Sequence, residues 1–282
     1  MTLRPILAPL VLAVLLAPPG AHPASAQVEL AGSWAARNHE NLSGDGLPVD
    51  YTGLPLNEEG RTKALSYSES QLAMIERQCQ GWPAFYFVQG PFGLRIWSDI
   101  DPISGDVVSW TIGAWEDRAP MTIWMDGRPH PGPYALHTRA GFTTGRWEGN
   151  TLVASTTHMK AGFVRKIGAP SSDQTTMITR FFRHGDLLTL LAVIDDPIYL
   201  AEPLILSKSF QLSATPVPAT GPPCVTAYEG GPEDGSVPHY LPEANPFIDE
   251  MTETYGIPRE GVLGGPETLY PEFREKLEAL SK

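Results

Sequence analysis

A succession of short strand-like segments, each bounded by turn residues, dominates the sequence between residues 85 and 212. These segments are rich in β-branched and aromatic residues, as strands are: Phe85–Val88, Leu94–Ser98, Val107–Ile112, Met121–Met125, Gly145–Trp147, Thr151–His158, Thr175–His184, Leu187–Ile194 and Leu204–Leu212. Strands at this spacing predict a mainly β fold, an antiparallel meander that forms a lipocalin-like barrel or a sandwich.

Two of the connections predict tight hairpin turns. Gly149 stands between Glu148 and Asn150, and Gly185 stands between His184 and Asp186. Glycine adopts positive φ without a steric penalty, and Asn and Asp also tolerate it, so both tripeptides suit a short turn between strands.

Short helices are expected on either side of this β region. Asn57 can cap a helix that carries Glu58 and Glu59 in its first turn, and a broken helical period then continues to the neighbourhood of Cys79. Beyond Ala214 a Pro/Gly-rich stretch leads to two further helical segments. These segments are Pro246–Tyr255 and Pro271–Leu280.

The N-terminus has the features of a secretory signal. Arg4 supplies the charged start, an apolar run follows over residues 6–17, and Ala24-Ser25-Ala26 has the small-x-small form of a cleavage site. The apolar run is too short and too rich in proline to span a bilayer, and no later stretch approaches the ~20 apolar residues of a spanning helix. We therefore predict an exported protein, periplasmic or secreted, without membrane insertion.

These observations divide the chain into successive parts, with the tail expected to pack on the β core. The expected parts are a signal peptide over residues 1–26, an N-terminal segment with short helices over 27–84, a β core over 85–214 and a C-terminal tail over 215–282.

The charge balance excludes some partners. The formal net charge is −12 at pH 7, which argues against nucleic acid and anionic lipid as ligands, whereas 42% hydrophobic residues are ample for a large core. The two cysteines, Cys79 and Cys224, would meet an oxidising compartment after export, which favours one long-range disulfide. The alternative is a pair of buried, unpaired thiols.

Several ordered motifs occur between Ile123 and Leu212. They are Ile123–Pro131 (IWMDGRPHP), Gly145–Val153 (GRWEGNTLV), Ser172-Asp173 and Asp196–Pro203 (DPIYLAEP). In this order they resemble a large family of uncharacterised exported bacterial proteins with the pattern MDGR-HP, GRWEGDTLVV, SD and DP-Y. Asn150 stands where that family usually has aspartate, a change that a turn can absorb. The resemblance implies an exported bacterial protein and names no function.

Motifs of the common catalytic and cofactor-binding classes are absent from the sequence. Neither Gly-x-Ser-x-Gly, Ser-x-x-Lys, a Gly-rich nucleotide motif nor His-Glu-x-x-His occurs, so no cofactor is expected. A site built from His130, His137, His158 and His184 with an aspartate would suit zinc or iron chemically. Because no pair of these histidines has a diagnostic ligand spacing, no metal is predicted.

Ionisable residues near strand ends are the candidates for chemistry. His158 ends a predicted strand near cationic residues, and His130 lies between prolines, so either imidazole is a candidate general base. Asp195 and Asp196 end a strand that is apolar on both faces and is therefore expected to be buried on both sides. Paired carboxylates there would have raised pKa values, and Asp173 completes this catalytic set. In the alternative interpretation, Asp196 opens a turn, Asp195 caps a neighbouring backbone and the histidines are ordinary strand-end or hydrogen-bonding residues.

A second set of residues is predicted to bind a ligand at the mouth of the barrel. Strand parity places Arg180 and His184 on one face, and Arg146 has ion pairing with Glu148 as its alternative role. The candidate binding residues are Asp126, Arg128, Arg146, Arg180, His184, Tyr199 and Glu202.

Three functions are compatible with these residues. The first is cofactor-free acid–base chemistry of the hydratase, isomerase or lyase type on a small amphipathic molecule. The second is a non-catalytic periplasmic carrier of such a molecule, and the third is an envelope interaction protein. A catalyst should gather ionisable groups around a pocket, and a carrier needs an apolar cavity with a polar anchor. An interaction protein should expose an apolar patch and have a filled barrel.

Overall fold

A computed structural model describes residues 28–37, 49–51, 53–114, 120–165, 167–218, 224–228 and 235–280. The expected signal peptide, residues 1–26, lies outside the described residues. Among the described helices, none combines the length and the apolar character needed to cross a membrane.

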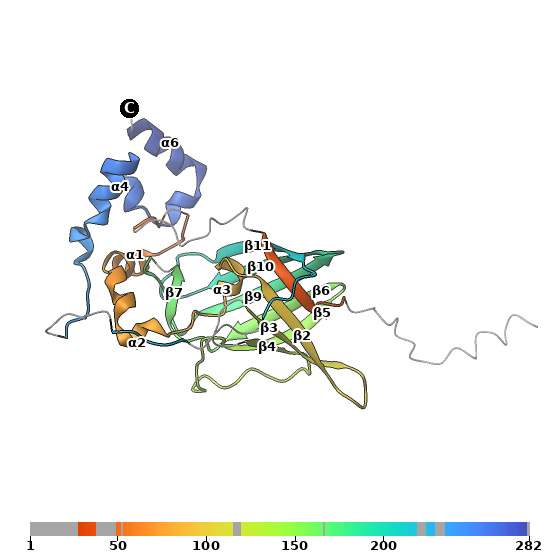
Figure 1. The fold of residues 1–282 in the computed structure, drawn as a ribbon. Coiled ribbons are helices and arrows are strands. Elements are labelled where there is room, and N and C mark those ends of the chain that lie inside the picture. Colours follow the sequence, from red (N-terminus) through yellow and green to blue (C-terminus); the bar gives the residue numbers. More distant parts are fainter. Residues whose placement is uncertain are drawn as a thin grey trace, which may run out of the picture.

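A closed β barrel forms the centre of the molecule (Figure 1). Around the barrel, the strand order is β1, β11, β10, β9, β6, β5, β4, β3 and β2. The strands are β1 (Gly32–Arg37), β2 (Leu94–Ile100), β3 (Val107–Gly113), β4 (Met121–Trp124), β5 (Phe142–Glu148), β6 (Thr151–Thr157), β9 (Thr176–His184), β10 (Leu187–Asp195) and β11 (Leu204–Leu212). The predicted mainly β, lipocalin-like barrel is confirmed, and the sheet is not a sandwich.

Strand β1 closes the barrel, although the sequence places it in the N-terminal segment outside the expected β core. Trp34 pairs with Leu94 of β2 and with Leu212 of β11, so β1 joins the two ends of the sheet. The full set of ladder hydrogen bonds leaves the sheet without an open edge.

One pair of neighbouring strands departs from the predicted antiparallel meander. Strands β4 and β5 are parallel, with Ile123 opposite Thr143 and Trp124 opposite Thr144. Parallel neighbours need a crossover, and residues 125–141 provide it by returning the chain to the starting end of β4. Short-range turn signals do not reveal such a crossover, which is why the meander prediction is wrong at this pair.

The barrel interior is packed with large apolar side chains. Trp34, Trp110, Phe181 and Phe210 are among the largest side chains that are fully buried. On β10 the inward side chains at positions 188, 190, 192 and 194 are buried, whereas positions 187, 189, 191 and 193 are half-buried. The expectation that β10 is buried on both faces is therefore wrong for its outer face.

Helix α3 (Tyr86–Gln89) lies where a strand was predicted over Phe85–Val88. Its Phe87 ring stacks on Phe181 of the barrel with ring centroids 6.2 Å apart. An apolar run of four residues looks the same in a buried strand and in a buried helix, so periodicity did not separate the two. Tyr86, Phe87 and Val88 of α3 are buried, and the helix packs against β10 and β11.

The predicted hairpin turns and helices are confirmed. Gly149 joins β5 to β6 with φ of 61°, and Gly185 joins β9 to β10 with φ of 59°. The Asn57 side chain accepts a hydrogen bond from the backbone N–H of Gly60 at 2.9 Å and caps α1. The N-terminal helices are α1 (Glu58–Leu65), the 3₁₀ turn η1 (Glu69–Ala73) and α2 (Ile75–Gln78).

The C-terminal helices gather beyond α1, at the same end of the barrel (Figure 1). They comprise α4 (Phe247–Tyr255), α5 (Arg259–Val262) and α6 (Pro271–Leu280), with 3₁₀ turns η2 (Pro242–Ala244) and η3 (Pro266–Leu269). A two-stranded ribbon of β7 (Gly162–Arg165) and β8 (Ala169–Ser171) lies between β6 and β9 in sequence. The strand pattern did not predict this ribbon.

Candidate functional site

A pocket of about 520 Å³ lies between the N-terminal helices and the β7–β8 ribbon. Figure 1 shows α1, α2 and β7 together at one end of the barrel. The lining residues come from α1, residues 66–67, η1, α2, residues 80–83, Arg139, residues 161–163, Gly168, Ser171 and Tyr199. The pocket therefore lies outside the barrel, and its size is within the usual range for a small-molecule site.

Aromatic rings form one wall of the pocket. The Phe163 ring centroid lies 5.0 Å from that of Tyr67 and 6.5 Å from that of Trp82. Gly168, with φ of 100°, allows the β7–β8 turn to approach, since a Cβ at this position would lie 2.4 Å from Tyr67 Cβ. This wall offers flat apolar surface to a ligand.

Three cationic side chains line the same pocket, and among the described residues no carboxylate lines it. Arg139 donates to the carbonyl oxygen of Ala161 at 2.7 Å and to Gln80 Oε1 at 3.0 Å. Lys63 is exposed, with its Nζ 5.4 Å from the Tyr199 ring centroid. The third cation is Arg77, which is half-buried at the end of α2. In a chain with a net charge of −12, this local excess of positive charge favours an anionic ligand.

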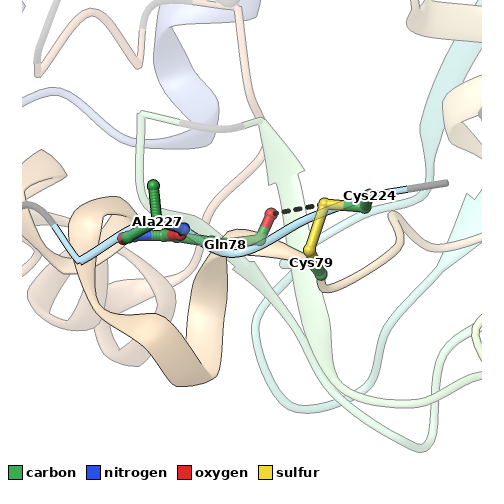
Figure 2. Close-up of a disulfide and its surroundings, with 4 residues drawn as sticks. All are labelled: Gln78, Cys79, Cys224 and Ala227. Carbon is green, nitrogen blue, oxygen red and sulfur yellow. Dashed lines mark hydrogen bonds between the residues drawn. A yellow bond between two sulfur atoms is a disulfide. The ribbon is translucent and has the colours of Figure 1, made fainter. Parts of the chain in front are cut away.

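A disulfide lies beside Gln78, one of the pocket residues (Figure 2). Cys79, directly after α2, is bonded to Cys224 with a Cα–Cα distance of 5.8 Å, which confirms the predicted bridge. Beside it, Gln78 Nε2 donates to the Ala227 carbonyl oxygen and Gln78 Oε1 accepts from the Ala227 N–H, both at 2.7 Å. The bridge and this amide pair attach residues 224–228 to the wall that carries Arg77.

The predicted bases His130 and His158 are joined through Thr157. Thr157 Oγ1 lies 2.7 Å from Nδ1 of each histidine. His158 Nε2 lies 3.0 Å from the Gly132 carbonyl oxygen, which only accepts, so His158 Nδ1 accepts from Thr157 when the ring is neutral. Thr157 then accepts from His130 Nδ1, and His130 Nε2 accepts from Thr144 at 2.9 Å. These groups form one directional hydrogen-bond chain.

Burial and the electrostatic effect of nearby His158 lower the pKa of His130. This favours a neutral His130 ring in the hydrogen-bond chain. His158 has φ of 57°, a strained value for a residue with a side chain, and its hydrogen bonds hold it there. The His137 ring lies 5.0 Å from the His158 ring, and its Nδ1 lies 3.0 Å from the Met159 carbonyl oxygen. None of the three histidines lines the pocket.

Asp196 lies at the centre of a buried hydrogen-bond network. Its carboxylate accepts from the Ser172 N–H and hydroxyl at 2.6 and 2.9 Å, and from the Ile198 N–H at 2.9 Å. The Thr175 hydroxyl and the Tyr199 N–H lie 2.8 and 3.2 Å from the same carboxylate. These donors match the turn-forming interpretation of Asp196 and leave the side chain only 1% exposed.

The other predicted catalytic carboxylates, Asp173 and Asp195, are exposed. Arg180 and His184 share a face of β9 as predicted, and it is the outer face, because the buried positions of β9 are 177, 179 and 181. Arg146 forms an exposed ion pair with Glu148, its alternative role in the sequence interpretation.

Three further predicted binding residues have protein partners outside the pocket. Asp126 accepts from Arg128, which lowers the pKa of Asp126, and the Arg128 guanidinium lies 3.6 Å from the Trp124 ring centroid. Glu202 accepts from the Tyr270 hydroxyl at 2.8 Å. Of the residues predicted from the sequence to be catalytic or ligand-binding, Tyr199 alone lines the pocket.

Sequence reasoning missed Lys208, a cation inside the barrel. Its side chain is 4% exposed, its Nζ donates to the Gly90 carbonyl oxygen, and burial lowers its pKa to about 8. Parity along β11 supplied the signal, because Lys208 shares a face with Leu206 and Phe210. The pocket cations Lys63, Arg77 and Arg139 were also missed, since they lie far apart in the sequence.

No group of three or more His, Cys, Asp or Glu side chains within the described part of the chain has an arrangement that holds a metal ion. Comparison with protein-family models, with curated proteins and with solved structures finds no match for this chain.

Proposed function

We propose that the protein binds a small amphipathic molecule in the pocket beside the barrel and holds it without chemical conversion. The observation that carries the proposal is the pocket lining, in which the aromatic wall of Tyr67, Trp82 and Phe163 faces the same space as three cations. An apolar wall with a few polar groups is the usual composition of a small-molecule site.

Binding is favoured over catalysis because the ionisable residues do not gather around the pocket. The hydrogen-bond chain of His130 and His158 lies elsewhere, Asp196 is occupied by backbone and hydroxyl donors, and Asp173 and Asp195 face solvent. A hydratase, isomerase or lyase would need an acid and a base within reach of the bound molecule.

We further propose that this carrier acts outside the cytoplasm. The Cys79–Cys224 disulfide supports an oxidising compartment, as expected for an exported periplasmic or secreted protein. Kinship with the exported bacterial family that the sequence resembles is proposed from the ordered motifs between Ile123 and Leu212.

Titration with small naphthalene derivatives tests the proposal. The purified full chain, with its disulfide intact, should bind at least one member of a set containing 2-naphthoate, 2-naphthamide and 2-naphthylamine, as measured by calorimetry. Trp82→Ala should weaken that binding about 10-fold or more, because a stacked ring contributes about 1 kcal/mol and its buried area adds to this.

Trp97→Ala is the matched control, because Trp97 is a half-buried tryptophan of β2 that does not line the pocket. It should leave the affinity within about 2-fold of the parent chain. Absence of binding by every member, or equal losses in the two tryptophan variants, would refute a ligand site at this pocket.

A further inference from the structure

The pocket contains several polar side chains besides its cations, and most of them already bond to the protein. Gln71 Nε2 donates to the Pro238 carbonyl oxygen at 2.7 Å, and Gln80 Nε2 donates to the Glu76 carbonyl oxygen at 2.6 Å. The Ser66 hydroxyl donates to the Lys63 carbonyl oxygen at 2.7 Å. These bonds leave the groups in structural roles, with little capacity to bind a ligand.

The Gln78 carboxamide is committed in the same way. Its Nε2 donates to the carbonyl oxygens of Ala73 and Ala227, both at 2.7 Å, while its Oε1 accepts from Ala227. Gln78 therefore fixes the end of α2 and the position of its neighbour Arg77, and it offers no free polar atom to the pocket.

The three cations differ in how far the protein occupies them. Arg139 uses two of its nitrogens on Ala161 and Gln80, and Lys63 is exposed beside the Tyr199 ring. Arg77 is half-buried, and its guanidinium makes no ion pair or hydrogen bond with any of the described residues. A half-buried guanidinium without a carboxylate partner is an uncompensated charge at the pocket wall.

A second observation concerns another residue of the pocket lining. Ser171, on β8, lines the pocket and is only 3% exposed, and its hydroxyl has no hydrogen-bond partner among the described residues. A buried hydroxyl without a partner is uncommon in native proteins and costs free energy. A ligand oxygen in the pocket would offer an acceptor to this side of the cavity.

From these observations we infer that the natural ligand is an organic monoanion, a carboxylate or its sulfonate isostere on an aromatic body, and that Arg77 is the residue that selects its charge. The inference depends on the proposed binding function and adds the ligand class to it. The guanidinium fork of Arg77 matches two carboxylate oxygens, while the Tyr67, Trp82 and Phe163 wall takes the apolar body. One uncommitted guanidinium suits one anionic head group.

Charge selectivity is the direct test. The full chain should bind 2-naphthoate at least about 10-fold more tightly than 2-naphthamide, which has nearly the same shape and no charge. Arg77→Gln should weaken 2-naphthoate about 10- to 100-fold, because hydrogen bonds to charged groups contribute about 1.5–3 kcal/mol, and it should change the affinity for 2-naphthamide by less than about 3-fold. Arg77→Lys keeps the charge without the fork, so it should recover part of the lost affinity.

Arg274→Gln is the matched control, since Arg274 is an exposed arginine of α6 that pairs with Glu278 far from the pocket. It should leave both affinities unchanged, and circular dichroism should show the same fold in every variant. Equal binding of naphthoate and naphthamide, or equal losses of both in Arg77→Gln, would overturn the monoanion inference while leaving a neutral-ligand carrier intact. Failure of every naphthalene probe to bind would instead refute the proposed function itself.

Discussion

The barrel interior and the pocket beside it are built in opposite ways. The interior is formed by paired strands whose inward positions carry rings such as Trp110, Phe181 and Phe210, each buried to 2% exposure or less. The pocket is formed by short helices, a small ribbon and loop residues, and cations such as Arg77 and Arg139 line it. The barrel is a packed scaffold, and the pocket that we propose as a ligand site lies at its end.

This difference shows that a lipocalin-like outline does not by itself place a ligand inside the barrel. Inward side chains that fill the space at close-packed density leave no room for a guest. Polar groups that recognise a ligand are then found on the connecting segments, where backbone and side chains can be arranged with fewer constraints than in a sheet.

The largest effect should come from opening the interior. Phe181→Ala removes a ring that stacks on Phe87 and should lower the free energy of unfolding by about 3–5 kcal/mol, through lost burial and the cavity that remains. Phe182→Ala, next in sequence but on the outer face and 40% exposed, should cost less than about 1 kcal/mol in urea unfolding. Similar small losses in both variants would contradict a close-packed interior.

Removing the disulfide should perturb the pocket more than the barrel interior. The double variant Cys79→Ala and Cys224→Ala should lower the free energy of unfolding by about 2–4 kcal/mol, because the bridge closes a loop with a sequence separation of 145. Naphthoate affinity should also fall as the Gln78–Ala227 contact loosens, while the near-ultraviolet circular dichroism of the barrel tryptophans stays unchanged. Unchanged affinity would show that residues 224–228 do not support the pocket.

Asp196 tests whether its buried carboxylate stabilises the connection after β10. Asp196→Ala should lower the free energy of unfolding by about 2–3 kcal/mol, since Ser172 and Ile198 would lose a charged acceptor in a buried site. The exposed neighbour Asp195→Ala should stay within about 0.5 kcal/mol in the same urea measurements. Equal losses in the free energy of unfolding at the two positions would contradict a stabilising role of the buried hydrogen-bond network.

Lys208 gives the smallest effect and a defined pH dependence. Its pKa is about 8 in the folded protein and near 10.5 when unfolded, so the unfolded chain binds more protons between these values and stability rises with pH across this window. The contribution is on the order of 2 kcal/mol. It should disappear in Lys208→Met and persist in the exposed-site control Lys160→Met, when unfolding is measured from pH 7 to 11. Parallel curves for all three proteins would show that Lys208 is well solvated.

Much of the fold followed from local pattern. The runs that became β3, β10 and β11 were predicted nearly to their ends, as was α6, because residue composition and bounding turn residues are local properties of the chain. Phe85–Val88 was assigned to the wrong element because its apolar run has no period to distinguish helix from strand.

The candidate site was much less predictable. Tyr199 was selected from a motif and does line the pocket, whereas Arg77, Arg139 and Phe163 were not recognised as one group. Residues 63–82 contain cations and aromatic side chains, but nothing in the sequence indicates that residues 139 and 163 fold against them. Conversely, His130 and His158 were selected individually, and only the structure shows that Thr157 connects them.

The sequence by itself determined the strand-rich composition of the core, the hairpin glycines at positions 149 and 185, and the two cysteines available for pairing. Tertiary structure alone decided the closure by β1, the parallel β4–β5 pair and the convergence of Arg77 with Arg139 and Phe163. The physical reason is the sequence separation of the residues that interact. Strand alternation and turn chemistry depend on neighbouring residues, whereas barrel closure and pocket assembly depend on packing between segments that are distant along the chain.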